Sequence, residues 1–583
     1  MEAEQRDDLH ALRHSAAHLM AHAVGDLFPG VKYAIGPPIE DGFYYDFDLP
    51  RPICEEDLPL IESRMREIAR QGLPIEPLVM DRESALAACE ASGQSYKVEL
   101  IRDLPEDEVL GFYRQGDWSD LCRGPHVPTT ADVRHFRLLS TAGAYWRGSE
   151  KNPMLTRIYG TAWHREEDLN AYLERLEEAR RRDHRKLGRD LGLFVFASED
   201  VGQGIPLFLP KGETVRHLME RYVREVQTRY GYQHVWTAHI VREELYRKSG
   251  HLDNYGHVMF PPMVDPDDGV TYRLKPMNCP SHMTLYNSQL HSYRDLPVRY
   301  AEFATLYRYE RTGELTGLTR VRSLTQDDCH IFCTEEQVEE EFGRALALIQ
   351  EVLQRHRFTE YRVRLSLRGD EPGGKYVADD EKWSRATEAL RRALAASGVE
   401  CFEAKGEAAF YGPKADFQTK DVLGREWTAS TIQVDFIQPA RLGCEYVDEA
   451  GARRTPVVLH RAVTGATERF LGLLIEQYAG AFPLWLAPVQ VALLPITDGQ
   501  AGYARSVADA LTAEGFRVET DGRSERVGKK IAEAEVQKVP YMLIMGRRDQ
   551  EAGVVSVRKR GEGDLGAMPL AQLLERLRVE LAE

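Results

Sequence analysis

Residues 273–333 gather side chains of the types that hold metals, phosphates and amines. This stretch begins R-L-K-P-M-N-C-P-S-H and ends T-Q-D-D-C-H-I-F-C, with several arginines between. Thiolates and imidazoles are ligands that zinc prefers, guanidinium groups match phosphate oxygens, and the adjacent Asp327 and Asp328 can hold an ammonium group. Taken singly, a cysteine or histidine is more often an inert core residue, and an arginine run is usually solvated. Together they indicate a pocket for a polyphosphate and a small amine beside a metal.

A second group of such side chains lies far upstream. His14 and His18 stand at i and i+4 in an apolar pattern with helical spacing, which places both on one helix face. Cys122 and His126 flank a Gly-Pro turn in D-L-C-R-G-P-H-V-P. Four side chains of this kind can bind a metal, organise a water molecule for hydrolysis, or simply pack. Their spacing favours the first two alternatives equally.

The length and composition are those of a multidomain globular protein. A chain of 583 residues is too long for one hydrophobic core, so about three or four domains are expected. No apolar run approaches the roughly 20 residues of a membrane helix. The acidic start M-E-A-E-Q-R-D-D lacks the features of a signal peptide. We therefore expect a cytoplasmic protein with no membrane partner.

The eight cysteines form no CxxC pair and do not resemble a disulfide framework. The formal net charge of −17 argues against nonspecific attraction to nucleic acid, so any RNA contact requires a local basic surface. Residues 523–560 offer one, with ten Lys/Arg against five Asp/Glu.

Changes in pattern along the chain predict its domains. Residues 166–188 are highly charged with a narrow apolar stripe, which predicts a linker helix. After residue 486, buried-strand patterns alternate with helical ones and predict a small α/β domain. The expected divisions are 1–165, 166–188, 189–486 and 487–583.

The segment A-E-F-A-T-L-Y-R-Y-E, residues 301–310, predicts a strand with Arg308 and Glu310 on the same face. One cation and one hydrogen-bond acceptor at this separation suit the α-phosphate and the adenine amino group of a nucleotide.

The motifs around this strand resemble the catalytic core of threonyl-tRNA synthetases, a class II aminoacyl-tRNA synthetase family. The similarity includes 301–310 as motif 2, V-L-H-R-A-V-T-G-A-T-E-R-F at 458–470 as motif 3, and 204–241 as motif 1, and nearly the whole chain can be laid along the family. The resemblance implies an α+β multidomain fold. Its parts are an antiparallel-sheet catalytic domain, an N-terminal α+β editing domain and a C-terminal α/β anticodon-binding domain. It also implies that the family's common N-terminal ubiquitin-like domain is lacking here.

The same resemblance implies ligation of threonine to tRNA(Thr) through a threonyl-adenylate. It assigns catalysis to Arg308, Arg469 and Lys414 and places ATP, with Mg²⁺, on Arg308, Glu310, Arg320 and Arg469. One zinc ion per subunit would be held by Cys279, His330 and His460, and threonine would contact Met277, Gln326, Asp328 and Tyr411. Motif 1 lies at the subunit interface in the family, so a homodimer is expected.

Specificity gives a physical reason for a second site. An apolar pocket discriminates poorly between a methyl group and a hydroxyl, whereas a zinc ion that takes the amino and β-hydroxyl groups rejects valine. Serine keeps both groups and lacks one methyl, worth only about 1–3 kcal/mol, so a hydrolytic step is required.

The resemblance also implies an editing pocket at the upstream histidines and cysteine. In the family this hydrolytic pocket is generally described as metal-free. The residues implied around the mischarged ester are His14, His18, Lys97, Asp120, Cys122 and His126. Those implied in anticodon contacts are Ser524, Lys538, Asp549 and Arg558.

Two segments depart from the family pattern. Ala238 replaces the usual motif 1 proline, and Thr428, Ala429 and Ser430 stand where the family reads Q-C-G. These changes keep two alternatives open. The chain could be a duplicate that resists an inhibitor of the housekeeping enzyme, or a paralogue that binds tRNA and regulates without charging it.

Overall fold

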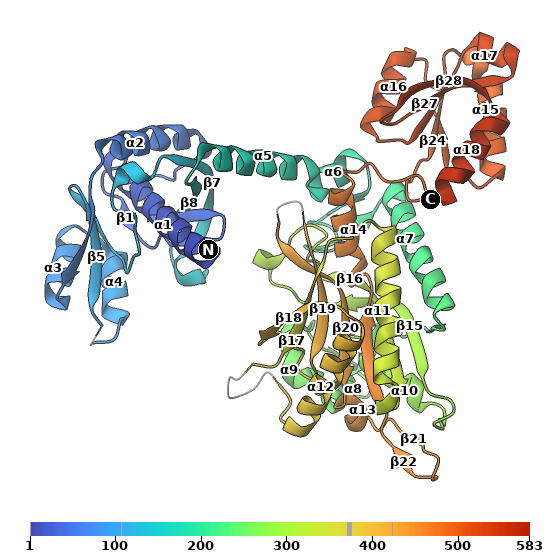
Figure 1. Cartoon of the computed structure of the whole chain (residues 1–583), viewed down its shortest axis with the longest axis horizontal. Coiled ribbons are helices and arrows are strands. Elements are labelled where there is room, and N and C mark those ends of the chain that lie inside the picture. Colours follow the sequence, from blue (N-terminus) through green and yellow to red (C-terminus); the bar gives the residue numbers. More distant parts are fainter. Residues whose placement is uncertain (1, 107, 370–375, 422–423, 583) are drawn as a thin grey trace. The chain divides into compact units, whose positions relative to one another are not determined.

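The computed structural model describes residues 2–106, 108–369, 376–421 and 424–582. They form two compact units, Met1–Glu177 and Glu178–Glu583 (Figure 1). Every helix among the described residues is too short or too polar to span a lipid bilayer. The predicted α+β multidomain fold is confirmed.

The first unit is built on a long helix packed against an antiparallel sheet. Helix α1 (Glu2–Leu27) contacts β3 (Gly42–Asp48) and β8 (Met154–Trp163), which continue into β7 (His135–Tyr145). Small side chains such as Ala16 and Ala17 are fully buried and allow close approach of helix and sheet. The helical spacing that predicted α1 therefore reflects a real packing face.

A smaller layer completes this unit. Strands β4 (Ile75–Met80), β5 (Leu110–Gln115) and β6 (Trp118–Leu121) form an antiparallel sheet. Helices α3 (Arg82–Ala91) and α4 (Ser95–Asp103) pack on it through a core that includes Cys89, Ile101 and Phe112. This layer carries Lys97 on α4 and delivers Cys122 directly after β6.

The predicted linker helix at 166–188 is two helices, α5 (Glu166–Arg182) and α6 (His184–Asp190). Asp183 leaves the helical conformation, and its side chain accepts a hydrogen bond from the Arg185 backbone N–H. An aspartate in this position caps a new helix, and this is why the first one ends.

The second unit contains an eight-stranded sheet. Its order is β11 (Gln233–His234), β15 (Val298–Tyr307), β16 (Ser323–Cys333), β23 (Val457–Ala462), β20 (Glu426–Asp435), β19 (Lys414–Lys420), β17 (Arg362–Leu367) and β18 (Cys401–Lys405). The sheet is antiparallel apart from its two outermost pairs. Helices α11 (Val338–Arg355) and α14 (Thr467–Gln477) pack against it in one large apolar core. Polar side chains gather on the other face.

The C-terminal part is a five-stranded mixed sheet. Strands β25 (Val518–Thr520), β24 (Val491–Pro495) and β26 (Tyr541–Met545) are parallel, whereas β27 (Val554–Lys559) and β28 (Gly563–Pro569) are antiparallel. The predicted alternation of strand and helix holds as far as β26. The last two strands form a hairpin that the sequence pattern did not reveal.

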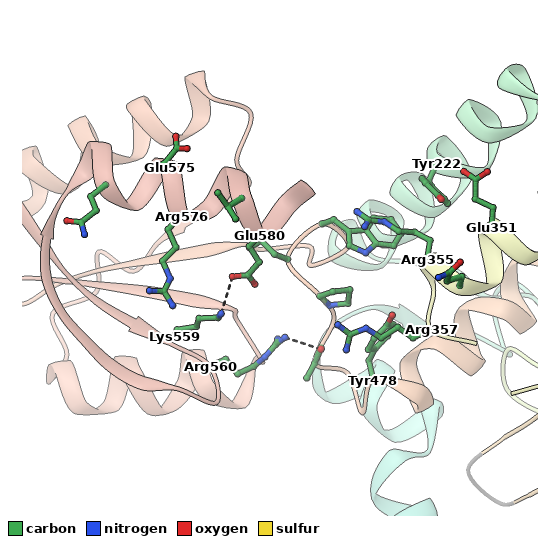
Figure 2. Close-up of a pocket in the computed structure, with 17 residues that line it drawn as sticks. Tyr222, Glu351, Arg355, Arg357, Tyr478, Lys559, Arg560, Glu575, Arg576 and Glu580 are labelled. Carbon is green, nitrogen blue, oxygen red and sulfur yellow. Dashed lines mark hydrogen bonds and ion pairs between the residues drawn. The ribbon is translucent and has the colours of Figure 1, made fainter. Parts of the chain in front are cut away.

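A cavity of about 1050 Å³ lies between this sheet and the eight-stranded domain (Figure 2). Arg560 donates hydrogen bonds to the carbonyl groups of Ala481 and Phe482 in the connecting segment. Lys559 forms an ion pair with Glu580 at 3.1 Å. None of the site residues predicted from sequence lines this cavity.

Candidate functional site

Three buried metal-type ligands come together from three elements of the second unit. Cys279 opens α10 (Cys279–Asn287), His330 lies on β16 and His460 lies on β23. Because His330 is the direct cross-strand partner of His460, their ring centroids lie 4.6 Å apart. One ligand atom from each of the three residues lies within 4.8 Å of the others.

The surroundings of this group suit a zinc ion. Asp435 lies 2.9 Å from Nε2 of His460, which fixes the proton on Nε2 and leaves Nδ1 free to bind a metal. Nε2 of His330 is buried without a hydrogen-bond partner among the described residues. Burial also lowers the pKa of His330 well below its usual value, so the ring stays neutral. A neutral imidazole is the form that binds metal.

A buried polar network that sequence reasoning missed supports Cys279. The Lys275 ammonium donates to Thr237 Oγ1 at 2.7 Å and to Asn278 Oδ1 at 2.9 Å. Asn278 in turn donates to Glu302 at 2.7 Å. Burial raises the pKa of Glu302, but hydrogen bonds from His282, Asn278 and Thr237 outweigh it and lower the pKa to about 2. The network fixes the loop just before α10.

Alternation along β16 separates its two aspartates. Gln326, Asp328 and His330 face one side, because side chains two residues apart share a face. Asp327 faces the other side, where it accepts hydrogen bonds from Gln227 Nε2 at 2.6 Å and from the Val463 backbone N–H at 2.9 Å. The expectation that both aspartates can hold an ammonium group is therefore wrong for Asp327.

Asp328 is the carboxylate that remains available beside the metal ligands. No described residue donates a hydrogen bond to it. Burial and the neighbouring carboxylates of Glu302 and Asp327 raise its pKa to about 8. A carboxylate in this position is stabilised by a bound amine.

The other residues predicted to contact threonine, and Lys414, which was predicted to be catalytic, come from separate elements. The Tyr411 ring is buried 5.0 Å from the His460 ring. Gln326 and Met277 are half-buried, and Met277 immediately precedes Asn278. Lys414 begins β19 and forms an ion pair with Asp416 at 2.9 Å. Arg364 also lies 3.1 Å from Asp416, so Lys414 and Arg364 share the Asp416 carboxylate.

The predicted phosphate-binding arginines converge beside the β15–β16 hairpin. Strand β15 ends at Tyr307, so Arg308 and Glu310 lie in the following loop and not on the strand as predicted. The Arg308 N–H still bonds to its in-register partner, the Arg322 carbonyl, at 2.9 Å. The Glu310 N–H instead turns back to the Arg308 carbonyl at 2.8 Å, and the pairing stops there. Arg469 on α14 donates to the Thr319 carbonyl of this loop, also at 2.9 Å.

Positive charge is in excess here. Burial, together with the nearby charges of Arg308 and Arg320, lowers the pKa of Arg469 to about 10. Glu310 lies 3.6 Å from Arg320 and is the acidic neighbour of these arginines. Clustered guanidinium groups with little counter-charge suit a polyphosphate.

The departures from the family pattern have local structural outcomes. Ala238 is exposed between β11 and β12 (Ile240–Arg242). Cross-strand pairing passes from Ser430 to Thr428, which makes Ala429 the extra residue of a β-bulge. Ser430 donates to the Val463 carbonyl, so the segment remains integrated in the sheet.

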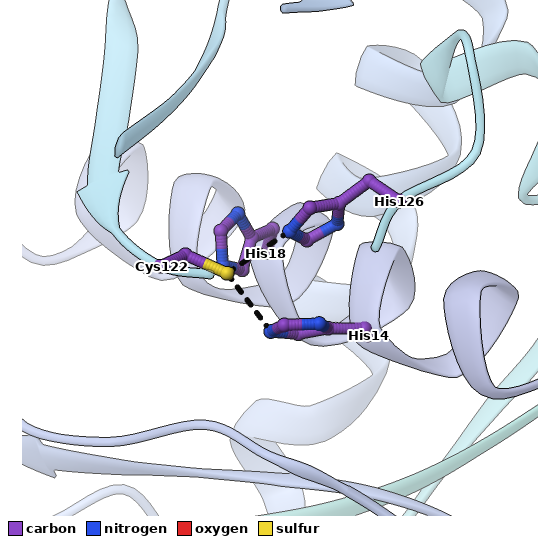
Figure 3. A group of neighbouring side chains, drawn as sticks. All are labelled: His14, His18, Cys122 and His126. Carbon is purple, nitrogen blue, oxygen red and sulfur yellow. Dashed lines mark hydrogen bonds between the residues drawn. The ribbon is translucent and has the colours of Figure 1, made fainter. Parts of the chain in front are cut away.

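In the first unit, His14, His18, Cys122 and His126 form a second cluster (Figure 3). The Cys122 sulfur lies 3.1 Å from His14 Nε2 and 3.2 Å from His126 Nε2. Ser15 Oγ donates its proton to the Ala11 carbonyl, so it accepts from His126 Nδ1, 3.0 Å away. The unprotonated Nε2 of His126 therefore faces the thiol.

A cavity of about 450 Å³ opens beside this cluster and is lined by His14, His18, Lys97 and Asp120. Lys97 and Asp120 form a buried ion pair at 2.6 Å. Tyr45 completes it, because Lys97 Nζ lies 3.1 Å from the hydroxyl and the hydroxyl donates to Asp120. Sequence reasoning missed Tyr45, although its inward position follows from the alternation of F-Y-Y-D-F in β3.

Burial sets the protonation of this pocket. It lowers the pKa of His14 to about 4 and that of His126 to about 3, and raises the pKa of Cys122 to about 11. Neighbouring histidines contribute to the lowered imidazole values. At neutral pH the pocket therefore holds neutral imidazoles and a neutral thiol.

The structure does not bring the four predicted anticodon residues together. Ser524 and Asp549 lie beyond the C-terminal ends of β25 and β26, whereas Lys538 precedes β26 and Arg558 pairs with Met542 near its start. Asp549 accepts from the Gly546 N–H and from Ser556 Oγ, each at 2.8 Å. Their roles in RNA contact stay predictions.

Comparisons with known proteins agree with this architecture. The family model "tRNA synthetase class II core domain (G, H, P, S and T)" matches residues 263–478, "Anticodon binding domain" matches 490–580, and "Threonyl and Alanyl tRNA synthetase second additional domain" matches 110–159. The fold and the site thus define a class II aminoacyl-tRNA synthetase.

Sequence identity to individual proteins shows which family of this class the chain resembles. The chain is 64% identical over 581 residues to a threonine--tRNA ligase of Rubrobacter xylanophilus, with 100% of this chain and 90% of that one covered. It is 50% identical over 577 residues to a threonine--tRNA ligase of Thermus thermophilus, with 97% and 87% covered. The solved RNA binding domain of threonyl-tRNA synthetase from Cryptosporidium parvum Iowa II is 34% identical, with a TM-score of 0.64, and covers 68% of this chain and 98% of that one. The chain belongs to the threonine–tRNA ligase family, whose substrates are threonine, ATP and tRNA(Thr).

A substitution behind the metal ligands tests the zinc assignment. Asp435→Asn removes the carboxylate that orients His460 but leaves all three ligands in place. We expect zinc affinity to fall about 10–100-fold, because a partner that orients a metal-bound histidine contributes on this scale. Competition titration with a chromogenic chelator measures the change, and Asp498→Asn at an exposed position is the control. Unchanged affinity would remove Asp435 from the metal site.

Proposed function

We propose that threonine and ATP bind along one face of β16 and that its order of residues fixes the order of substrate groups. The supporting observation is the sequence Gln326, Asp328, His330 on that face, with the arginine loop at the start of the strand and the metal ligands near its end. At about 3.3 Å per residue, this face spans an amino acid joined to a nucleotide phosphate. Phosphates would lie toward Arg308 and the amino group toward His330.

In the proposed reaction, the threonine carboxylate attacks the α-phosphate of ATP and pyrophosphate leaves. A hydroxyl of the terminal ribose of tRNA then attacks the carbonyl carbon of the adenylate, which forms the threonyl ester and releases AMP. Arg308 and Arg469 stabilise charge on the transferring phosphate, Arg320 contacts the distal phosphates and Glu310 accepts from the adenine amino group. Mg²⁺ accompanies ATP. Little proton transfer by side chains is required, in accord with a site built mainly from fixed charges.

Amino-acid selection is assigned to the opposite end of the strand. Zinc held by Cys279, His330 and His460 supplies, when bound, a Lewis acid for the amino and β-hydroxyl groups of threonine. Asp328 accepts a hydrogen bond from the amino group, and Tyr411 closes the pocket against His460. Valine lacks the hydroxyl, so a site built to bind that group rejects it.

We further propose that the pocket of the first unit hydrolyses seryl-tRNA(Thr). Its neutral imidazoles can accept a proton from an attacking water. The Lys97–Asp120–Tyr45 group provides fixed polarity on the adjoining wall. Metal binding by the same four residues is a second candidate, favoured by ligand atoms that all lie within 4.8 Å of one another.

Subunit association is proposed through the segment around Ala238. Trp236 and Ile240 flank it with 72% and 52% of their surfaces exposed. Two large apolar side chains this exposed on one short segment are typical of a surface that binds a partner. A second copy of the chain is the proposed partner, and the cytoplasm the proposed location.

The ATP site is tested by Arg469→Gln. We expect threonine-dependent ATP–pyrophosphate exchange to fall about 100-fold or more, since a buried charge that stabilises the transition state is lost. The exposed Arg344→Gln on α11 is the matched control. Full exchange activity in Arg469→Gln would contradict the assignment.

The editing pocket is tested by a double variant, His14→Ala with His18→Ala. We expect hydrolysis of seryl-tRNA(Thr) to slow about 100-fold, while ATP–pyrophosphate exchange in the other unit stays unchanged. His164→Ala, an exposed histidine of the same unit, serves as the control. Hydrolysis at the wild-type rate in the double variant would exclude these residues from editing.

The association surface is tested by Trp236→Glu, which places a charge in the proposed apolar contact. Light scattering after size exclusion should report a dimer for the wild type and a monomer for the variant. The exposed Leu290→Glu, in the loop that follows α10, should remain dimeric. A Trp236→Glu protein that remains dimeric would show that association uses another surface.

A further inference from the structure

His184, the first residue of α6, is almost completely buried, with 2% of its surface exposed. Both ring nitrogens are engaged. Nε2 lies 3.0 Å from the backbone nitrogen of Leu318, and Nδ1 lies 2.7 Å from Glu476 Oε1. A backbone N–H can only donate, so Nε2 is unprotonated and Nδ1–H donates to the carboxylate. The ring thus joins two segments far apart in sequence.

The glycine before Leu318 makes room for this ring. Gly317 has φ +47°, and a Cβ there would lie 2.3 Å from His184 Nε2. The left-handed conformation of Gly317 directs the Leu318 N–H toward the histidine. The turn at Gly317 therefore fits closely against the imidazole.

Both partners of His184 belong to elements that carry the proposed ATP ligands. Leu318 lies in the loop that contains Arg308 and Arg320, and Glu476 lies on α14, which contains Arg469. The loop and helix also meet through Arg469 Nε and the Thr319 carbonyl, 2.9 Å apart. His184 contacts the residue next to Thr319. His184 therefore holds the same loop against the same helix through a second pair of contacts.

We infer that His184 is a positioning residue for ATP binding: it clamps the loop of Arg308 and Arg320 to the helix of Arg469 without touching the nucleotide. The inference rests on the proposed ATP site. Two further observations set the contact apart from ordinary packing. Glu476 is itself buried, and its Oε2 has no hydrogen-bond partner among the described residues. Burying an unpaired carboxylate oxygen opposes folding, so the presence of Glu476 beside His184 is not explained by stability alone.

The role predicts a selective kinetic defect. His184→Leu removes both hydrogen bonds, and we expect KM for ATP in pyrophosphate exchange to rise about tenfold. KM for threonine and bound zinc should stay within about twofold of the wild type, because the metal end of β16 is not attached to this clamp. The exposed His217→Leu on α7 (Pro210–Arg229) is the matched control. Thermal unfolding of each variant monitors the fold.

A conservative series keeps the test decisive if His184→Leu is unstable. His184→Gln places an amide oxygen where it can accept from the Leu318 N–H, so it should recover most of the ATP affinity. Glu476→Gln keeps an acceptor for Nδ1–H and should change KM for ATP less than about twofold. Equal increases in both KM values, or a lowered unfolding temperature with unchanged KM for ATP, would overturn the positioning role.

Arg469→Gln, measured in parallel, separates the two ideas. If Arg469→Gln leaves exchange intact, the proposed ATP site is wrong and the clamp has no site to position. If Arg469→Gln abolishes exchange while His184→Leu and His184→Gln retain normal KM for ATP, only the inference about His184 fails.

Discussion

The register between β16 and β23 is the constraint on which the catalytic site depends. It pairs His330 directly with His460 and brings two ligands together that no local motif connects. Because strand side chains alternate, a slip of one residue would turn His330 and Asp328 into the apolar core and expose Asp327 and Cys329 instead. The opposite face resists such a slip. There, Asp327 binds Gln227 and the Val463 backbone N–H, which fixes the strand from behind.

The two ends of β16 carry opposite charge imbalances. Near His330, burial keeps the imidazole neutral and leaves Asp328 without a protein donor among the described residues, so a cationic ligand completes the balance. Near the arginine loop, positive charge is in excess and an anion completes the balance. In the proposed binding mode, the amino group of threonine would balance the carboxylate at one end and the phosphates of ATP would balance the guanidinium groups at the other.

Sequence patterns predicted the elements better than their ends. Apolar spacing predicted the helix around His14 and His18 and the first strands after residue 486, whereas the antiparallel catalytic sheet was expected from the family resemblance. Strand β15 ends at Tyr307 although Arg308 and Glu310 were predicted to lie on it, because the Glu310 N–H bonds to the Arg308 carbonyl and not to a neighbouring strand. The linker helix breaks at Asp183, where a local cap outweighs the continuing charged pattern. The hairpin of β27 and β28 was hidden because its orientation is set by packing against β26.

The sequence also predicted some residues of the site and missed others. Family motifs pointed to Cys279, His330 and His460, whose separations in sequence follow no ligand-spacing rule, and the fold brings them together. Networks such as Lys275–Asn278–Glu302, Tyr45 with Lys97, and His184 with Glu476 were missed because each joins segments distant in sequence. A residue type alone does not reveal a buried partner of this kind.

The most direct test of the metal-centred account is a crystal of the protein with threonine, measured with X-rays on both sides of the zinc absorption edge. The account predicts one strong anomalous peak per chain, bounded by Cys279, His330 and His460, with the threonine amino group beside Asp328. An absent peak at these residues, or a single peak among His14, His18, Cys122 and His126, would contradict it.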